Sequence, residues 1–213
     1  MKSKKVFQAK TILLAQGTKR RKLNIPGEDN FLGRGVSYCA TCDAMFYQDK
    51  VVAVVGGSDS AQTSSLYLAQ VAKKVYQIYR GKKLRGEVAW IEQVEKNPKI
   101  KVIFNSQIQK LKGKKVLEEI VIENTQQEKR KLVIDGLFIE IGTIPHQHLT
   151  QSLGLNVNSG GYVKVSADQR TNQEGVWAAG DITDGSNNFR QIVTACSEGA
   201  IAAENIFKFL SKK

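Results

Sequence analysis

The chain has 213 residues, 41% of them hydrophobic and 24% charged, which excludes a disordered polymer and allows one large or two small domains. Its formal charge is +12, but the lysines and arginines are spread along the chain without a recognisable nucleic-acid-binding motif. We therefore expect no nucleic-acid partner, and a basic surface that attracts anionic cofactors or an acidic protein.

The apolar runs of the chain are short. None approaches the roughly 20 residues that a membrane span requires. The basic opening at residues 1–5 has the charge order of a secretory signal, but the apolar stretch after it is too short and lacks a cleavage site. With only three cysteines, the chain is expected in the cytoplasm, with no membrane partner.

The first elements along the chain are simple. Residues 8–15 are expected to form a buried strand that Gly17 ends, and residues 19–29 form a polar connector. After the connector comes the most informative segment of the chain, Cys39-Ala40-Thr41-Cys42-Asp43.

Two thiols separated by two residues can close a small disulfide and open it again, which favours a dithiol oxidoreductase. Two other interpretations stay open: half of a zinc site, or a thiol pair without a catalytic task. The remaining candidate zinc ligands are Cys196, His146 and His148, and none forms a second close cysteine pair. Asp43 can exchange a proton with a thiol, or simply form a turn or cap. We expect no metal.

A βαβ unit follows the cysteines. Residues 50–55 read as a strand buried on both faces, and 75–79 as a second strand. The helix between them has a buried face of Ala61, Ser65, Leu68, Ala69 and Ala72. The turn before it approaches the dinucleotide fingerprint GxGxxA, with serine in place of the middle glycine. It consists of Gly56, Gly57, Ser58, Asp59, Ser60 and Ala61.

The second strand of this unit ends in a basic segment containing Arg80, Lys82, Lys83 and Arg85. NAD sites usually place a carboxylate here, whereas arginine suits the 2′-phosphate of NADP. The segment therefore favours NADPH, and a basic loop without a ligand is the alternative.

The rest of the chain is expected to contain both helices and strands. A helix is expected over 87–96, a strand over 100–104, an antiparallel meander over 107–111, 116–123 and 131–134, and a strand over 137–141. Residues 142–145 read as a hinge. The last helix should bury a stripe that includes Cys196 as a small core residue; the stripe comprises Ile192, Cys196, Gly199, Ala203, Ile206 and Leu210.

Five motifs in register carry a family resemblance. They are CATCD at 39–43, GGSDSA at 56–61, the basic segment 80–85, VWAAGD at 176–181 and RQIVTA at 190–195. Together they resemble low-molecular-weight thioredoxin reductase over nearly the whole chain. The resemblance implies an α/β fold: a Rossmann-like NADPH domain, with a parallel sheet and an antiparallel meander, inserted in an incomplete FAD domain. Residues 1–17 would be a strand of the FAD domain, 18–141 the NADPH domain with the CxxC, and 142–213 the rest of the FAD domain.

The resemblance also implies a mechanism. Electrons would pass from NADPH through FAD to the cysteine pair and then to thioredoxin or a similar small dithiol protein. Cys42 would face the flavin, Cys39 would attack the partner disulfide, and Asp43 would serve as the acid. The FAD contacts would fall on Gly180, Asp181, Arg190, Gln191 and Ile192.

Several departures from the family pattern affect what is expected. Family members begin with a strand, a GxGxxG turn and a helix for the ADP half of FAD, and are homodimers; this sequence starts after that segment. We therefore expect the isolated chain to hold FAD weakly or not at all, and to need a flavin-domain partner. The usual HRR motif reads Tyr79-Arg80-Gly81. The alternative functions are a non-catalytic binding or regulatory module, and a reductase for another protein.

Overall fold

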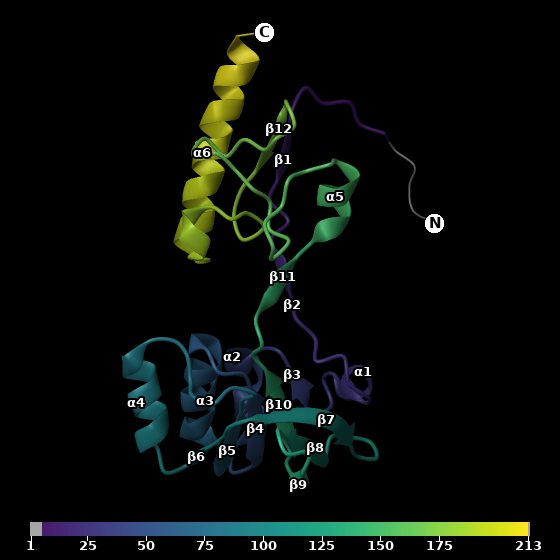
Figure 1. Cartoon of the computed structure of the whole chain (residues 1–213), viewed down its shortest axis with the longest axis vertical. Helices are drawn as coiled ribbons and strands as arrows, with labels where there is room; N and C mark the ends of the chain where they lie inside the picture. Colours follow the sequence, from purple (N-terminus) through teal and green to yellow (C-terminus); the bar gives the residue numbers. More distant parts are fainter. Residues whose placement is uncertain (1–5, 213) are drawn as a thin grey trace. The chain divides into compact units, whose positions relative to one another are not determined.

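A computed structural model describes residues 6–212, which fall into two compact units (Figure 1). One unit is the continuous stretch Arg20–Gly142, and the other combines residues 6–19 with 143–212. Residues 1–5, part of the predicted first segment 1–17, lie outside the described residues. None of the helices in the described range is long and apolar enough to cross a membrane.

The continuous unit is built on a parallel sheet of five strands in the order β3-β10-β4-β5-β6. The strands are β3 (Val36–Ser37), β4 (Val51–Val55), β5 (Lys74–Ile78), β6 (Ile100–Ile103) and β10 (Gly136–Ile139). The apolar run of β4 is buried from Val52 to Val55, because strands on both sides and layers on both faces cover it. The predicted strands are confirmed, with ends shifted by one or two residues.

Helices cover one face of this sheet. They are α2 (Ala40–Asp43), the 3-10 turn η1 (Ala44–Tyr47), α3 (Asp59–Val71) and α4 (Val88–Lys96). The short α1 (Glu28–Phe31) instead packs through Phe31 into the core on the other face. The predicted inner face of α3 is confirmed, since Ala61, Ser65, Leu68 and Ala69 are buried, as is Ala72 just after the helix. Side chains of Val52, Val54 and Val75 meet this face in one core cluster.

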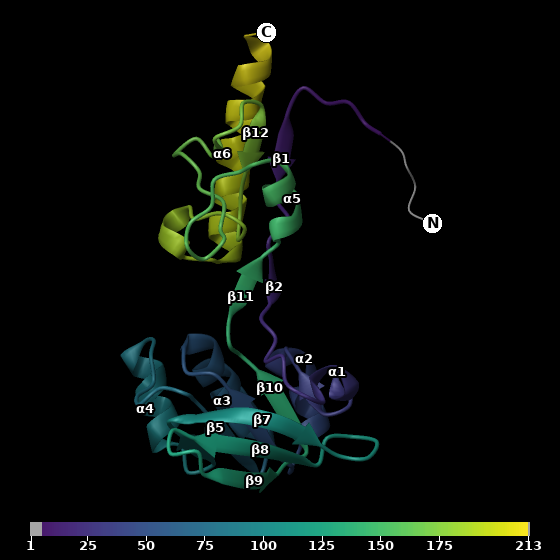
Figure 2. The same cartoon turned by 45° about the vertical axis from the view of Figure 1, so that its right-hand side comes forward.

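An antiparallel meander covers the other face, as Figure 2 shows. Its strands are β7 (Ser106–Lys112), β8 (Glu119–Asn124) and β9 (Lys129–Val133), ordered β7-β8-β9. Alternate residues point inward and join one core with Ala53, Val55 and Ile78 of the parallel sheet; they are Ile108, Leu111, Ile120, Ile122 and Leu132. The predicted meander is therefore confirmed, and it makes this unit a three-layer arrangement.

The other unit has short strands and one long helix. Strand β1 (Ile12–Leu14) pairs in parallel with β12 (Val176–Ala178), and β2 (Thr18–Arg20) pairs with β11 (Thr143–Pro145). The helices are α5 (Gln147–Ser152), the 3-10 turn η2 (Ser186–Asn188) and the long α6 (Ile192–Ser211). The buried strand predicted over 8–15 shrinks to β1, in which only Leu14 is buried.

The predicted inner stripe of α6 is confirmed at Ile206 and wrong at Ile192 and Cys196. The helix packs on Trp177 and Ala179 through Ala202, Ile206 and Phe209, whereas Ile192 is 86% exposed. Cys196 is exposed rather than a buried core residue. Apolar side chains occur all around α6, so helical spacing alone cannot select the face that packs inward.

Candidate functional site

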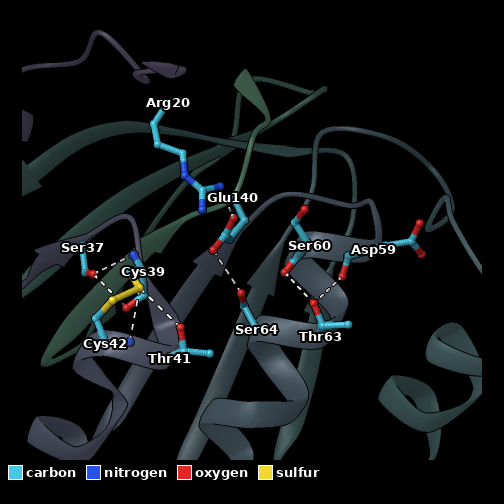
Figure 3. A network of polar contacts seen from close by, with 10 residues as sticks. All are labelled: Arg20, Ser37, Cys39, Thr41, Cys42, Asp59, Ser60, Thr63, Ser64 and Glu140. Atoms are coloured by element: carbon cyan, nitrogen blue, oxygen red, sulfur yellow. Dashed lines mark hydrogen bonds and ion pairs between the residues drawn. A yellow bond between two sulfur atoms is a disulfide. The ribbon is translucent and has the colours of Figure 1, made fainter. Parts of the chain in front are cut away.

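The two cysteines of the CxxC are bonded to each other at the start of α2 (Figure 3). Cys39 is the residue before the first turn of α2 and is half-buried, while Cys42 lies inside the helix and is exposed. The backbone N–H of Cys42 donates to the Cys39 sulfur over 3.2 Å, and Oγ1 of Thr41 lies 3.4 Å from the same sulfur. These polar groups favour negative charge on the Cys39 sulfur once the bond is reduced.

Asp43, the predicted acid, is held by a serine that the sequence reasoning missed. The hydroxyl of Ser37, at the end of β3, donates to Oδ2 of Asp43 over 2.6 Å and accepts from the backbone N–H of Cys39 over 3.0 Å. Ser37 is only 5% exposed. Its position two residues before the first cysteine was the available signal. One hydroxyl thus fixes the carboxylate relative to the disulfide.

The disulfide segment is attached to the helix that follows the glycine turn. Ala40 and Ala44 share a core cluster with Ala61 and Leu68 of α3. Because these contacts involve small side chains, the two backbones approach closely. The cysteine pair and the predicted nucleotide helix therefore belong to one packed layer.

The predicted nucleotide turn lies where the strand order changes direction. From β4 the chain proceeds to β5 and β6 on one side, while β10 and β3 lie on the other, so a crevice is expected beyond the ends of β4 and β10. Gly56 follows β4 with φ +147°, and a Cβ there would lie 2.2 Å from the carbonyl oxygen of Glu140. Only glycine fits at this point.

The beginning of α3 suits a phosphate group. Ser58 precedes the helix and its side chain makes no capping hydrogen bond, so it does not occupy the N–H groups of Asp59 and Ser60 at the start of α3. Ala61 is fully buried beneath the turn, as the last position of the fingerprint requires, and Asp59 and Ser60 begin the helix. The basic side chains of Arg80, Lys82, Lys83 and Arg85 are all exposed, in the loop that follows β5. These residues fit a phosphorylated nucleotide.

A buried carboxylate, that of Glu140, belongs to the residue whose backbone lies against Gly56 of the glycine turn (Figure 3). Glu140 is 4% exposed and accepts hydrogen bonds from Arg20, over 3.1 Å, and from the Ser64 hydroxyl, over 3.0 Å. Burial raises the pKa of the Glu140 carboxyl above its ordinary value of 4.5, although the Arg20 guanidinium and Ser64 act in the opposite direction.

This shift predicts a pH-dependent stability. The folded state holds the Glu140 proton more tightly than the unfolded state, so the contribution of this group is most favourable below pH 4.5 and is lost as the pH rises through the raised pKa. In urea unfolding, the free energy of unfolding of wild type should therefore fall relative to that of Glu140→Gln as the pH rises from about 4.5 towards 7. Arg20→Gln should enlarge the fall. A difference that is independent of pH, or that moves the other way, would contradict this.

The predicted flavin residues lie together in the second unit. Gly180, Asp181, Arg190, Gln191 and Ile192 all line one hollow of about 560 Å³, which we call the α6 hollow. Its other lining residues are mostly small; they are Ala15, Gly17, Thr18, Ala179, Ala195 and Gly199. Small walls, an acid, a base and the start of a long helix fit the ring and ribityl part of a flavin.

The loop that carries Asp181 is held by a second residue missed from the sequence, Glu198 of α6. Its carboxylate accepts from the Gly180 N–H over 2.8 Å, from the Thr183 hydroxyl over 2.8 Å and from the Ser186 hydroxyl over 2.7 Å. Glu198 is 4% exposed. A glutamate among alanine, serine and glycine on the last helix was the available signal.

Arg190 is oriented by an aromatic ring. Its guanidinium lies 3.7 Å from the ring centre of Tyr162, and its Nε donates to the carbonyl oxygen of Asp181 over 3.4 Å. Arg190 and Asp181 therefore keep a fixed spacing at the edge of the α6 hollow.

The alternative zinc ligands lie on different elements of the chain. The sulfurs of Cys39 and Cys42 are bonded together, Cys196 lies on α6, and His148 lies in α5 with His146 just before it. Within residues 6–212 there is no group of three or more His, Cys, Asp or Glu side chains placed to hold a metal ion.

Comparison with known proteins gives consistent matches. A family model described as pyridine nucleotide-disulphide oxidoreductase matches residues 1–199. Thioredoxin reductases of Treponema pallidum and Peptoclostridium acidaminophilum are each 39% identical to the chain, covering 92% and 96% of it. The chain spans 63% and 66% of their respective lengths. The crystal structure of Lactococcus lactis thioredoxin reductase is similar to the chain with a TM-score of 0.87 and 35% identity. The match covers 95% of this chain and 67% of the Lactococcus lactis chain.

Proposed function

The chain belongs to the pyridine nucleotide-disulphide oxidoreductase family, and from that membership we propose that it serves as a thioredoxin reductase. In this proposal NADPH is the electron donor, FAD the relay, and thioredoxin or a similar small dithiol protein the acceptor. The observation that carries it is the Cys39–Cys42 disulfide, packed through α2 on the helix that follows the glycine turn.

The chain's own residues would perform the dithiol exchange. In the reduced pair, the Cys39 thiolate attacks one sulfur of the partner disulfide; a mixed disulfide forms and a partner thiolate leaves. The Cys42 thiolate then attacks the Cys39 sulfur, closes the Cys39–Cys42 bond and releases the second partner thiolate. Asp43, held by Ser37, exchanges protons with the sulfurs. Two electrons and two protons reach the partner in total.

The cofactors have candidate binding residues in each unit. When bound, NADPH and FAD supply the electron pair that opens the disulfide. The glycine turn, the start of α3, Arg80 and Arg85 would hold the phosphates of NADPH. The residues of the α6 hollow, Asp181 and Arg190 among them, would hold the ring and ribityl part of FAD. A flavin titration measures how tightly these residues hold FAD.

The protein partner has a candidate docking surface beside the disulfide. Met45 and Phe46 follow Asp43 and are 66% and 72% exposed. Replacing Phe46 with serine should slow reduction of oxidised thioredoxin by the pre-reduced chain roughly five- to thirtyfold, because a large apolar contact is lost. Reduction of the small disulfide DTNB should not change. Phe207→Ser, an equally exposed phenylalanine on α6, is the matched control and should have no effect. Equal slowing by both variants would contradict a docking role.

The Ser37 hydroxyl should matter for proton exchange. Ser37→Ala removes the donor that holds Asp43, so transfer from the reduced chain to thioredoxin should slow about tenfold near neutral pH and its pH profile should change shape. The control is Ser64→Ala, which removes another buried hydroxyl that donates to a carboxylate, in this case the carboxylate of Glu140. Stopped-flow rates between pH 5 and 9 measure both. Identical profiles for the two variants would contradict the role of Ser37.

The function as a whole has a direct test. The chain is fused to the flavin-binding segment of a homologous thioredoxin reductase, loaded with FAD, and supplied with NADPH and oxidised thioredoxin. NADPH consumption followed at 340 nm should depend on thioredoxin and disappear in Cys39→Ser. A flavin-loaded fusion that consumes no NADPH with thioredoxin would contradict the proposal. We further propose a cytoplasmic location and a homodimer, which fractionation and light scattering measure.

A further inference from the structure

We propose that Tyr79 is the positioning residue that orients Arg85 towards the 2′-phosphate of NADPH, and that Gly81 lacks a side chain because the Tyr79 ring needs the space. This inference rests on the proposed donor function and names the residues that set its selectivity for NADPH over NADH. It also accounts for the sequence Tyr79-Arg80-Gly81, where thioredoxin reductases carry HRR.

The Tyr79 ring lies between two glycines. Tyr79 follows β5 directly, and its backbone is fixed on both sides, since its N–H donates to the Ile103 carbonyl and its carbonyl accepts from the Ser106 N–H. A Cβ on Gly57 would lie 2.4 Å from the ring, and a Cβ on Gly81 would lie 2.6 Å from it. Neither position tolerates a side chain while the ring stays in place.

The backbone of Arg85 is attached to the same turn. Its N–H donates to the Gly57 carbonyl over 2.7 Å, and its carbonyl accepts from Nε2 of the fully buried Gln62 over 2.7 Å. The loop is fixed again two residues later, where the Glu87 N–H donates to Oδ1 of Asp59 over 2.8 Å. The backbone of Arg85 is therefore fixed beside the glycine turn.

The side chain of Arg85 extends over the Tyr79 ring, with its guanidinium carbon 5.8 Å from the ring centre. A cation at this distance from an aromatic ring is attracted to it, and the contact restricts the rotamers of a long, exposed side chain. Restriction before binding reduces the entropy lost when the guanidinium meets a phosphate. NADH has no 2′-phosphate, so the benefit applies to NADPH alone.

The test is a comparison of two ring variants in the full chain. Binding of NADPH and of NADH is measured by calorimetric titration for wild type, Tyr79→Leu and the matched control Tyr79→Phe, which keeps the ring. Tyr79→Leu should weaken NADPH binding about three- to fivefold and leave NADH within about twofold. Tyr79→Phe should match wild type. The inference is overturned if Leu and Phe variants bind NADPH equally, or if NADH weakens as much as NADPH.

A double-mutant cycle tests the part of Gly81. Gly81→Ala in wild type should displace the ring and weaken NADPH binding, whereas in Tyr79→Leu, whose shorter side chain does not reach position 81, it should add nothing. Equal effects in both backgrounds would overturn this role, and thermal melts check that each variant folds. A wild-type chain that binds neither nucleotide would instead overturn the proposed donor itself, so the two failures are distinguishable.

Discussion

Replacing Cys42 with serine is expected to trap the protein partner as a mixed disulfide on Cys39. Cys39 can still attack the partner disulfide, but no second thiol remains to release it. Release of reduced thioredoxin from the pre-reduced chain should therefore fall on the order of a thousandfold or more. The expected product is a covalent complex that dithiothreitol separates.

The structure gives a physical reason for this order of attack. The Cys39 sulfur has the Cys42 N–H and the Thr41 hydroxyl within reach, so it carries negative charge more readily after reduction. Cys42 is the more exposed residue, however, and accessibility alone would favour the opposite order. The experiment therefore decides between charge stabilisation and exposure as the controlling factor.

The measurement needs a clean background. Because Cys196 is exposed, it can form unwanted mixed disulfides, so all variants are made in Cys196→Ser. Reduced proteins are mixed with oxidised thioredoxin, quenched with acid and analysed by non-reducing electrophoresis and mass spectrometry. Cys39→Ser is the paired control and should give little complex. A complex that accumulates in Cys39→Ser but not in Cys42→Ser would reverse the assignment.

Replacing Glu198 with alanine is expected to be the most destabilising single change on α6. It leaves the Gly180 N–H and the hydroxyls of Thr183 and Ser186 without their shared acceptor; Thr183 is buried, Gly180 is half-buried and Ser186 is exposed. Loss of a buried charged acceptor that three donors share suggests a cost of about 2 kcal/mol in the free energy of unfolding. Glu198→Gln, which keeps one acceptor oxygen, should cost less.

Fluorescence of Trp177 can report this change, because the ring is buried against Phe209 of the same helix. The chain has two tryptophans, so Trp90→Phe provides a background in which Trp177 is the single reporter. Glu204→Ala is the matched control, since its ion pair with Lys208 is 60% exposed on both sides and should change stability by less than about 1 kcal/mol. Equal urea midpoints for the variants at 198 and 204 would contradict the prediction.

The sequence allowed the central sheet to be predicted because its signals are local. The apolar run of β4, the spacing of small residues on α3 and the alternation in the meander each determine an element without reference to the rest of the chain. The pairing of Cys39 with Cys42 could be predicted for the same reason, since the two cysteines are near neighbours in sequence.

The residues that were missed act through contacts that the sequence does not encode locally. Ser37 acquires its role because β3 ends beside the first turn of α2, and Glu198 because α6 passes the loop that follows β12. Cys196 was misplaced because every face of α6 carries apolar residues and only the position of Trp177 selects one. Such assignments need the tertiary structure.

The unit formed by residues 20–142 begins and ends at adjoining points. The N–H of Arg21 donates to the carbonyl of Gly142 over 2.9 Å. An insertion whose entry and exit meet in this way can be excised, or exchanged for another, by splicing with a very short peptide bridge. For the same reason, another domain whose termini lie close together could be inserted at this position without distorting β2 and β11.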